Sequence, residues 1–238
     1  MRFLSAGDRA LVVDFGNRID RALSEEVLRL AASLRADELS GVVETVPTFR
    51  SLMVHYDPLV TSSTVLEGAI ASLLDREPGP RAPATLWRVP VCYEDEFAPD
   101  LAEVARLTGL APDEVVTLHS GVPYHVYMLG FLPGFPYMGD LPAALVLPRR
   151  ADPRVRVPAG SLSIATSLTA IYPYESPGGW HLIGTTPVRL FDIRRASPAL
   201  LAPGDAVLFA PIDAGTFAVI KAAVSSGEYQ VAGEPIAG

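Results

Sequence analysis

The chain is organised around the stretch Gly130-Phe-Leu-Pro-Gly-Phe-Pro-Tyr-Met-Gly-Asp-Leu-Pro142. A stretch of the same kind follows downstream, Tyr172-Pro-Tyr-Glu-Ser-Pro-Gly-Gly-Trp-His-Leu-Ile-Gly184. Glycine and proline at this density disfavour both helices and regular strands, and they favour rigid loops that present aromatic rings. Because rigid loops lose little freedom on binding, the sequence predicts that these two loops form a site or an interface. The rest of the chain is then their scaffold.

The first part of the scaffold has the pattern of a small α+β domain. Alternating apolar residues predict four strands, at residues 3–4, 10–15, 42–46 and 52–56. Apolar spacings of three and four predict a helix from Ile19 to Leu34. A second helix is predicted near residues 64–74, which Ser62, Ser63 or Thr64 can cap, and Thr64 and Glu67 have capping-box spacing. The order ββαββα, ending in the Pro- and Gly-rich linker 77–83, predicts a first domain over residues 1–82.

Residues 83–238 are predicted to form a β-barrel or sandwich. A strand over Leu86–Tyr93 comes first, and two short helices over residues 99–107 and 112–119 follow, with prolines near their starts. Beyond them, short apolar runs between proline and glycine turns are typical of a closed all-β domain. These runs predict strands at residues 124–131, 161–165, 170–172, 187–191, 206–209 and 217–220.

The composition is that of an ordinary globular protein. Of the 238 residues, 49% are hydrophobic and 19% are charged. The net charge of -8 argues against a non-specific nucleic-acid binder, which needs clustered cations. Cys92 is the only cysteine, so no internal disulfide can form and a reducing compartment, the cytoplasm, is expected. No apolar run has the length of a membrane span, and no signal peptide is evident.

Several common catalytic motifs are absent. Lys221 is the only lysine, so there is no P-loop and no kinase-type lysine, and ATP would have to be held in another way or by a partner. Dinucleotide-binding, serine-hydrolase and zincin motifs are missing as well. Four histidines, His55, His119, His125 and His181, lack the spacing of a metal site, and we predict no metal.

The candidate binding residues lie on the two loops and, for Arg154, in the segment between them. Arg154 offers a planar fork for a carboxylate or phosphate, and four aromatic residues, Phe135, Tyr137, Tyr172 and Trp180, could line a small pocket. The same aromatic residues could instead form core or a protein–protein patch. Pro177 and Gly178 fit the centre of a type II turn, in which Gly179 adds an amide to a nest for an anionic oxygen. The alternative is a tight turn without a ligand.

Few side chains are suited to proton transfer. His181 follows the Pro-Gly-Gly-Trp segment and is the best acid–base candidate, and Glu175 and Asp140 are the best-placed carboxylates. Cys92 lies in an apolar strand, where a buried thiol is inert. Arg149, Arg150, Arg154 and Arg156 form a local basic cluster, which is either a solvated edge or an anion site.

On these residues the chain resembles the family of the 5-oxoprolinase B subunit, also called KipI or allophanate hydrolase subunit 1. The two loops are the most specific part of the resemblance, which spans nearly the whole chain. Further segments that carry it are Gly7–Leu11, Phe15-Gly16, Tyr56–Pro58, Val91–Tyr93, Pro99–Leu101, His119, Pro153-Arg154, Val157-Pro158 and Gly160-Ser161.

The resemblance implies a fold, an activity and partners. The fold is a small α+β domain followed by a cyclophilin-like β-barrel. The activity is ATP-dependent opening of 5-oxo-L-proline to L-glutamate, together with the A subunit of 5-oxoprolinase and with a homologous C subunit of the KipA or allophanate hydrolase subunit 2 type. The site would be shared, so the isolated chain is expected to be inactive, and ATP with Mg would bind at the level of the complex. Family members described as inhibitors of a sensor histidine kinase, and a role in urea or allophanate metabolism, are open alternatives.

The chain departs from the family pattern in one segment. Where the family commonly has Gly-Glu-Gln-Thr-Gly-Ile-Tyr-Pro, this chain has Thr166-Ser-Leu-Thr-Ala-Ile-Tyr-Pro173. Leu168 therefore replaces a polar glutamine, and Ala170 replaces a glycine. If that glutamine contacts the substrate, the activity or specificity of this copy differs, which favours the non-enzymatic alternative slightly.

Overall fold

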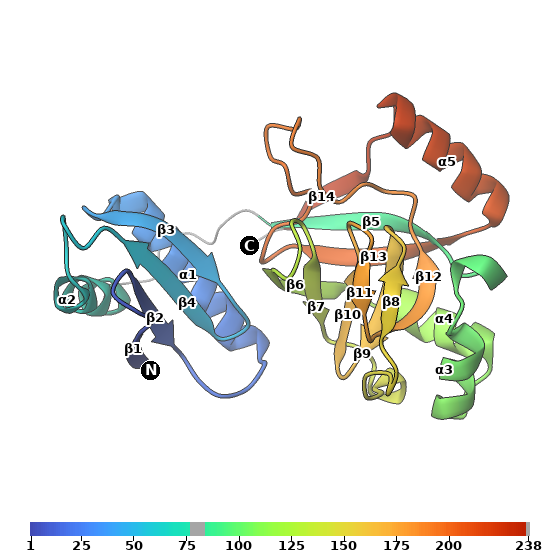
Figure 1. The fold of residues 1–238 in the computed structure, drawn as a ribbon, viewed down its shortest axis with the longest axis horizontal. Coiled ribbons are helices and arrows are strands. Elements are labelled where there is room, and N and C mark those ends of the chain that lie inside the picture. Colours follow the sequence, from blue (N-terminus) through green and yellow to red (C-terminus); the bar gives the residue numbers. More distant parts are fainter. Residues whose placement is uncertain (77–83, 237–238) are drawn as a thin grey trace. The chain divides into compact units, whose positions relative to one another are not determined.

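The computed structural model describes residues 1–76 and 84–236. They form two compact units, and residues 1–76 belong to the first and residues 84–236 to the second. The predicted linker, residues 77–83, lies outside the described residues. Figure 1 shows the elements of both units.

The first unit is a four-stranded antiparallel sheet with two helices packed on it (Figure 1). Its elements are β1 (Arg2–Ser5), β2 (Ala10–Asp14), α1 (Arg21–Asp37), β3 (Val42–Pro47), β4 (Ser51–Tyr56) and α2 (Ser63–Leu74). The strand order is β1-β2-β4-β3. Alternating residues of β4 join the apolar stripe of α1 in one core, which includes Leu52, Val54, Val27 and Leu30. The predicted order ββαββα is confirmed.

The helix starts of the first unit follow their capping residues. The Asp20 carboxylate accepts hydrogen bonds from the N–H groups of Ala22 and Leu23, so α1 begins two residues after Ile19. At α2, Ser62 is the N-cap and accepts from the Val65 N–H. Ser62, one of the three predicted cap residues, is thus confirmed, whereas the capping box of Thr64 and Glu67 is wrong because Thr64 already lies inside the helix.

The second unit is a closed barrel. Seven strands follow the order β12-β9-β10-β7-β6-β13-β5, and a pairing between β12 and β5 closes the ring. β14 also pairs with β5, at residues other than the one that pairs with β12. β8 and β11 form a separate two-stranded ribbon. The strands are β5 (Ala84–Cys92), β6 (Tyr124–Leu129), β7 (Pro136–Gly139), β8 (Arg154–Val157), β9 (Ser161–Ala165), β10 (Leu168–Ile171), β11 (Ser176–Gly178), β12 (His181–Thr185), β13 (Ala206–Ile212) and β14 (Ala232–Ile236).

Three helices accompany the barrel. They are α3 (Leu101–Thr108), α4 (Pro112–Ser120) and α5 (Ala214–Ser226), and two short 3-10 helices span Asp95–Phe97 and Ala143–Leu145. Figure 1 shows α3 and α4 together at one end of the barrel and α5 on its outer side. The barrel core includes Val89, Val126, Ile164 and Val207. No helix in residues 1–76 and 84–236 is long and apolar enough to cross a membrane.

Two predicted strands of the second unit are wrong. Residues 217–220 lie in α5, which Asp213 caps at its start and Gly227, in the left-handed region, ends. Only Phe217 of this helix is buried. The helix therefore has no buried apolar stripe, and its sequence lacks the helical period that such a stripe produces. Residues 187–191 form no strand beyond a single bridge between Phe191 and Ala199.

Candidate functional site

The first aromatic loop contains a strand that the sequence did not predict. Phe135 and Gly130 close a turn, since the Gly130 N–H donates to the Phe135 carbonyl at 3.1 Å. β7 follows at once and pairs with β6 and β10. Gly134 has a φ of +75°, and a Cβ there would come within 2.9 Å of the Phe191 Cβ. This position therefore needs glycine both for its backbone and for its packing.

The four predicted aromatic residues of the two loops lie together. The Phe135 ring centroid is 5.0 Å from that of Tyr137, 5.1 Å from that of Tyr172 and 6.3 Å from that of Trp180. Phe135, Tyr172 and Trp180 are buried, and Tyr137 is half-buried. These edge-on and tilted contacts join the loops rigidly. Phe135 is the centre of the cluster, and Tyr137 is the member that stays accessible.

The second loop is built differently from its predicted turn. Ser176–Gly178 is the strand β11, which pairs with β8, and Gly178 is absent from the residues with positive φ. A type II turn requires positive φ at that position, so the predicted turn at Pro177 and Gly178 is wrong. Gly178 is needed for another reason, since a Cβ there would lie 2.3 Å from the Tyr172 hydroxyl oxygen. The Gly179 carbonyl accepts from the Arg150 N–H at 2.8 Å.

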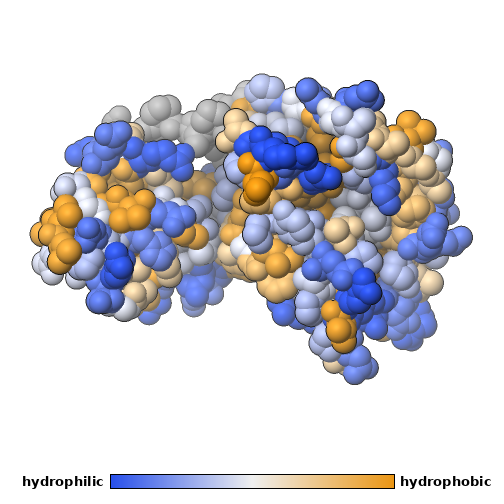
Figure 2. Space-filling view, turned by 45° about the horizontal axis from the view of Figure 1, so that its top comes forward, coloured by the Kyte–Doolittle hydropathy of each residue, from blue (hydrophilic) through white to orange (hydrophobic). Residues whose placement is uncertain are grey.

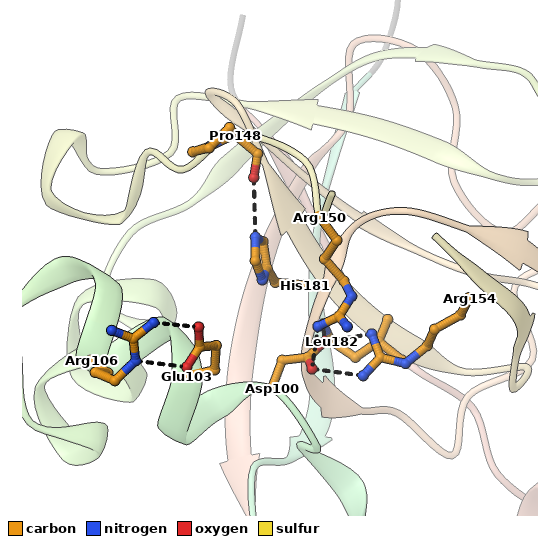
Figure 3. Close-up of polar contacts among 8 residues, drawn as sticks. All are labelled: Asp100, Glu103, Arg106, Pro148, Arg150, Arg154, His181 and Leu182. Atoms are coloured by element: carbon orange, nitrogen blue, oxygen red, sulfur yellow. Dashed lines mark hydrogen bonds and ion pairs between the residues drawn. The ribbon is translucent and has the colours of Figure 1, made fainter. Parts of the chain in front are cut away.

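Arg154 is bound within the chain. Both of its terminal nitrogens donate to the Asp100 carboxylate, at 2.8 and 2.7 Å (Figure 3). Asp100 is buried and also accepts from Arg150, at 3.0 Å, and from the Leu182 N–H, at 2.7 Å. We call this group, Asp100 with Arg150, Arg154 and Leu182, the Asp100 cluster. It ties the start of α3 to β8, β12 and the segment before β8, so the predicted carboxylate fork of Arg154 already holds an internal carboxylate.

His181 lies beside the Asp100 cluster with one ring nitrogen unpaired. Its Nε2 is 3.0 Å from the Pro148 carbonyl oxygen, which can only accept, so Nε2 carries the proton. Nδ1 is buried with no hydrogen-bond partner among the described residues. The Arg150 Nε–H donor is likewise buried without a partner among the described residues. Figure 3 shows Glu103, paired with Arg106, on the neighbouring helix.

The two predicted carboxylates lie away from this group. Glu175 is exposed and forms a two-point ion pair with Arg156, at 2.9 and 2.7 Å. The Arg156 hydrogen bonds lower the pKa of Glu175, which makes it a weaker base. Asp140 accepts from the Tyr127 hydroxyl at 3.2 Å. Glu175 and His181 thus contact different partners.

A buried polar chain inside the barrel has no counterpart in the sequence prediction. The Thr169 hydroxyl donates to the Ser163 carbonyl at 2.9 Å, so it accepts from His119 Nε2 at 3.0 Å. His119 Nδ1 then accepts from the Tyr93 hydroxyl at 3.0 Å. Burial lowers the pKa of His119 to about 3, so the ring is neutral. Only the three-dimensional pairing of α4 with β10 brings these residues together.

The remaining candidate residues have plain structural surroundings. Cys92 is buried, and burial raises the pKa of its thiol. Leu168 and Ala170 are buried in β10, on either side of Thr169. His125 is buried against the Tyr127 ring, and His55 is half-exposed on β4. Among the described residues, no group of three or more His, Cys, Asp or Glu side chains is placed to hold a metal ion.

With this geometry in hand, comparison with known proteins defines the class. Residues 1–201 match the family model of the carboxyltransferase domain, subdomain C and D. The chain is 38% identical over 221 residues to the 5-oxoprolinase B subunit of Bacillus subtilis (strain 168), covering 87% of this chain and 90% of that protein. The chain therefore belongs to the carboxyltransferase-domain family and, within it, to the family of the 5-oxoprolinase B subunit.

Solved structures extend the comparison. The crystal structure of TTHA0988 is similar with a TM-score of 0.77 and 38% identity, over 86% of this chain and 40% of that chain. The present chain thus spans about two fifths of that longer protein. The Kluyveromyces lactis urea amidolyase, at 20% identity and a TM-score of 0.79, shares the fold over 98% of this chain and 16% of its own.

Proposed function

We propose that this chain is the B subunit of a 5-oxoprolinase complex that opens 5-oxo-L-proline to L-glutamate at the expense of ATP. Family membership supports this reaction, and the incomplete set of groups on the two loops supports a shared site. The loops offer an aromatic cluster and a buried histidine with an unpartnered ring nitrogen, and the segment between them adds arginines. They offer no phosphate-binding loop in the described residues, and the only lysine, Lys221, lies far along the chain in α5.

The proposed reaction needs activation of the lactam. Transfer of the ATP γ-phosphoryl group to the lactam oxygen turns a resonance-stabilised amide into an activated imidate. Water then adds to the ring carbon, and the ring C–N bond breaks as its nitrogen is protonated, which leaves an acyl phosphate and the amine of glutamate. A second water hydrolyses the acyl phosphate to the glutamate side-chain carboxylate and phosphate. We propose that ATP with Mg binds on the partner subunits, and that His181 is the proton-transfer group of this chain, since its Nδ1 has no hydrogen-bond partner among the described residues. Glu175 is the weaker candidate, because its ion pair stabilises the charged form.

Exposed apolar side chains around the same loops support a partner contact. Phe131 is 61% exposed with a φ of +70°, a costly conformation for a bulky residue. Tyr174 and Ile193 are exposed as well, and Phe191 packs against Tyr174 and Gly134. Figure 2 shows hydrophobic residues in small groups among hydrophilic ones. We propose that Phe131, Tyr174 and Ile193 are covered by the C subunit in the complex, which works in the cytoplasm.

Reconstitution tests the proposal. The isolated chain should not hydrolyse 5-oxoproline with ATP, whereas the chain combined with the A and C subunits should release glutamate and phosphate together.

Phe131→Gly should weaken assembly at least about tenfold while changing the free energy of unfolding by less than about 1 kcal/mol, because relief of the backbone offsets the lost contact with Phe135. Leu59→Ser, at a 94% exposed site of the first unit, is the matched control. Turnover by the isolated chain would refute the shared site.

A further inference from the structure

Arginines concentrate near the second loop in a chain that is acidic overall. Residues 148–200 contain seven arginines and three acidic residues, although the net charge of the whole chain is -8. Six of these arginines donate to a carboxylate or a carbonyl oxygen within the chain. Arg150 and Arg154 bind Asp100, Arg156 binds Glu175, Arg189 and Arg194 bind Asp192, and Arg195 binds the Arg189 carbonyl.

Arg149 is the exception among the described residues. Its guanidinium carbon lies 5.9 Å from the centroid of the Trp180 ring, and its side chain is exposed with no hydrogen bond to a carboxylate. A guanidinium over an indole keeps its N–H edge free to bind an anion. Arg149 is therefore the arginine of this region whose charge is available to a ligand.

The backbone on both sides of Arg149 is fixed. The Pro148 carbonyl contacts His181 Nε2 at 3.0 Å (Figure 3), and the Arg150 N–H donates to the Gly179 carbonyl at 2.8 Å. The Arg150 guanidinium is bound to Asp100. Arg149 thus projects from a segment whose two neighbours are tied to the second loop, so placing its charge costs little further entropy.

The Arg149 charge also reaches the accessible side of the aromatic cluster. Burial raises the pKa of Tyr137 and of Tyr172, and the Arg149 charge opposes both shifts. Tyr137 is the half-buried ring of the cluster and contacts Trp180 at 6.1 Å between ring centroids, and Arg149 provides a planar two-point donor over Trp180. A small, flat molecule with one carboxylate matches both features.

We propose that Arg149, seated on Trp180, binds the carboxylate of the cyclic amide substrate. This inference rests on the proposed function. It assigns the substrate carboxylate to Arg149 and not to Arg154, because Asp100 already binds Arg154. The phosphate oxygens of ATP are the competing anion. The two anions predict different kinetic effects. If Arg149 binds the substrate carboxylate, its loss changes the KM for the lactam, and if it binds the ATP phosphates, its loss changes the KM for ATP.

Kinetics of the reconstituted complex separate these cases. Arg149→Gln should raise the KM for 5-oxoproline about 10- to 100-fold, the loss expected for a charge-assisted hydrogen bond, with kcat within about threefold. The KM of Arg149→Lys for 5-oxoproline should lie between those of wild type and Arg149→Gln, because an ammonium keeps the charge but cannot bind a carboxylate at two points. The lactam 2-pyrrolidinone, which lacks the carboxylate, should be used equally poorly by wild type and Arg149→Gln. Arg106→Gln, on the exposed surface of α3, is the matched control.

Each outcome decides the inference. An unchanged KM for 5-oxoproline in Arg149→Gln would overturn it while the proposed function stands, and a raised KM for ATP alone would assign Arg149 to phosphate. If the wild-type complex shows no turnover, the proposed function fails, and binding of 5-oxoproline then tests the role of Arg149. The indole N–H resonance of Trp180 should then shift with 5-oxoproline in wild type and not in Arg149→Gln, with Trp87 as internal reference. Equal responses in both proteins would overturn the inference.

Discussion

His119 and His181 are both buried in the barrel unit, with 0% and 5% of the residue exposed, yet their ring nitrogens are used differently. Both nitrogens of His119 are hydrogen-bonded to neutral hydroxyl groups. His181 has one bonded nitrogen and one buried nitrogen without a partner among the described residues, next to the charges of the Asp100 cluster.

On the proposed function, this difference separates a histidine that stabilises the fold from a histidine that takes part in the reaction. A fully paired, neutral ring stabilises the barrel, because removing either partner leaves a buried polar atom unsatisfied. A buried acceptor without a partner costs about 1–3 kcal/mol, so stability alone does not explain it. The comparison predicts that substitutions near His119 change stability, whereas substitution of His181 changes chemistry.

The largest effect is expected at Asp100, which holds the charges around His181 in place. Asp100→Asn should lower the free energy of unfolding by about 3–5 kcal/mol, because it leaves two partly buried guanidinium groups without a counter-charge. Glu103→Gln, which breaks an exposed pair with Arg106 nearby, should cost less than about 0.5 kcal/mol. Chemical denaturation measures both. A cost below about 1 kcal/mol for Asp100→Asn would show that the cluster does not hold the site together.

The next effect is the pH dependence that His119 produces. The pKa of His119 is about 3 in the folded protein and 6.5 is the ordinary value, so below pH 6.5 the unfolded chain binds a proton that the native ring refuses. Its contribution to stability is complete above that pH and is lost as the pH falls, by about 1.4 kcal/mol per pH unit. The difference in unfolding free energy between wild type and His119→Gln should shrink at that rate between about pH 6 and pH 4. A constant difference would contradict a neutral, buried His119.

Local patterns in the sequence were sufficient to predict the first unit and five of the seven barrel strands, while β7 and β12 were missed. Alternation on β4 and the apolar stripe of α1 depend only on neighbouring residues, so the ββαββα order follows from them. α5 was missed because it buries one side, at Phe217, and its β-branched residues Val219 and Ile220 look like a strand. Its N-cap at Asp213 and its ending at Gly227 were the available signals.

The site could be predicted in its residue types but not in its pairings. The aromatic residues of the two loops were identified, because glycine, proline and rings in one segment are a local signal. The partner of Arg154 is Asp100, 54 residues away in sequence, and no local pattern reports such a contact. Once that carboxylate is assigned to Arg154, Arg149 is the arginine left for a ligand. Likewise, His181 Nε2 contacts the Pro148 carbonyl, which only folding brings to it, so no local pattern predicts which ring nitrogen is left without a partner.

The smallest effect on stability is expected at His181, where the comparison is tested most directly. His181→Gln keeps a donor for the Pro148 carbonyl and removes the Nδ1 acceptor, so the free energy of unfolding should change by less than about 1 kcal/mol. Turnover of the reconstituted complex should nevertheless fall about 10²- to 10⁴-fold, as expected for loss of a proton-transfer group. His119→Gln should show the reverse pattern, with a large loss of stability and nearly normal turnover per folded molecule. If His181→Gln loses stability and keeps its turnover, the unpaired nitrogen belongs to the fold, and proton transfer must come from a partner chain.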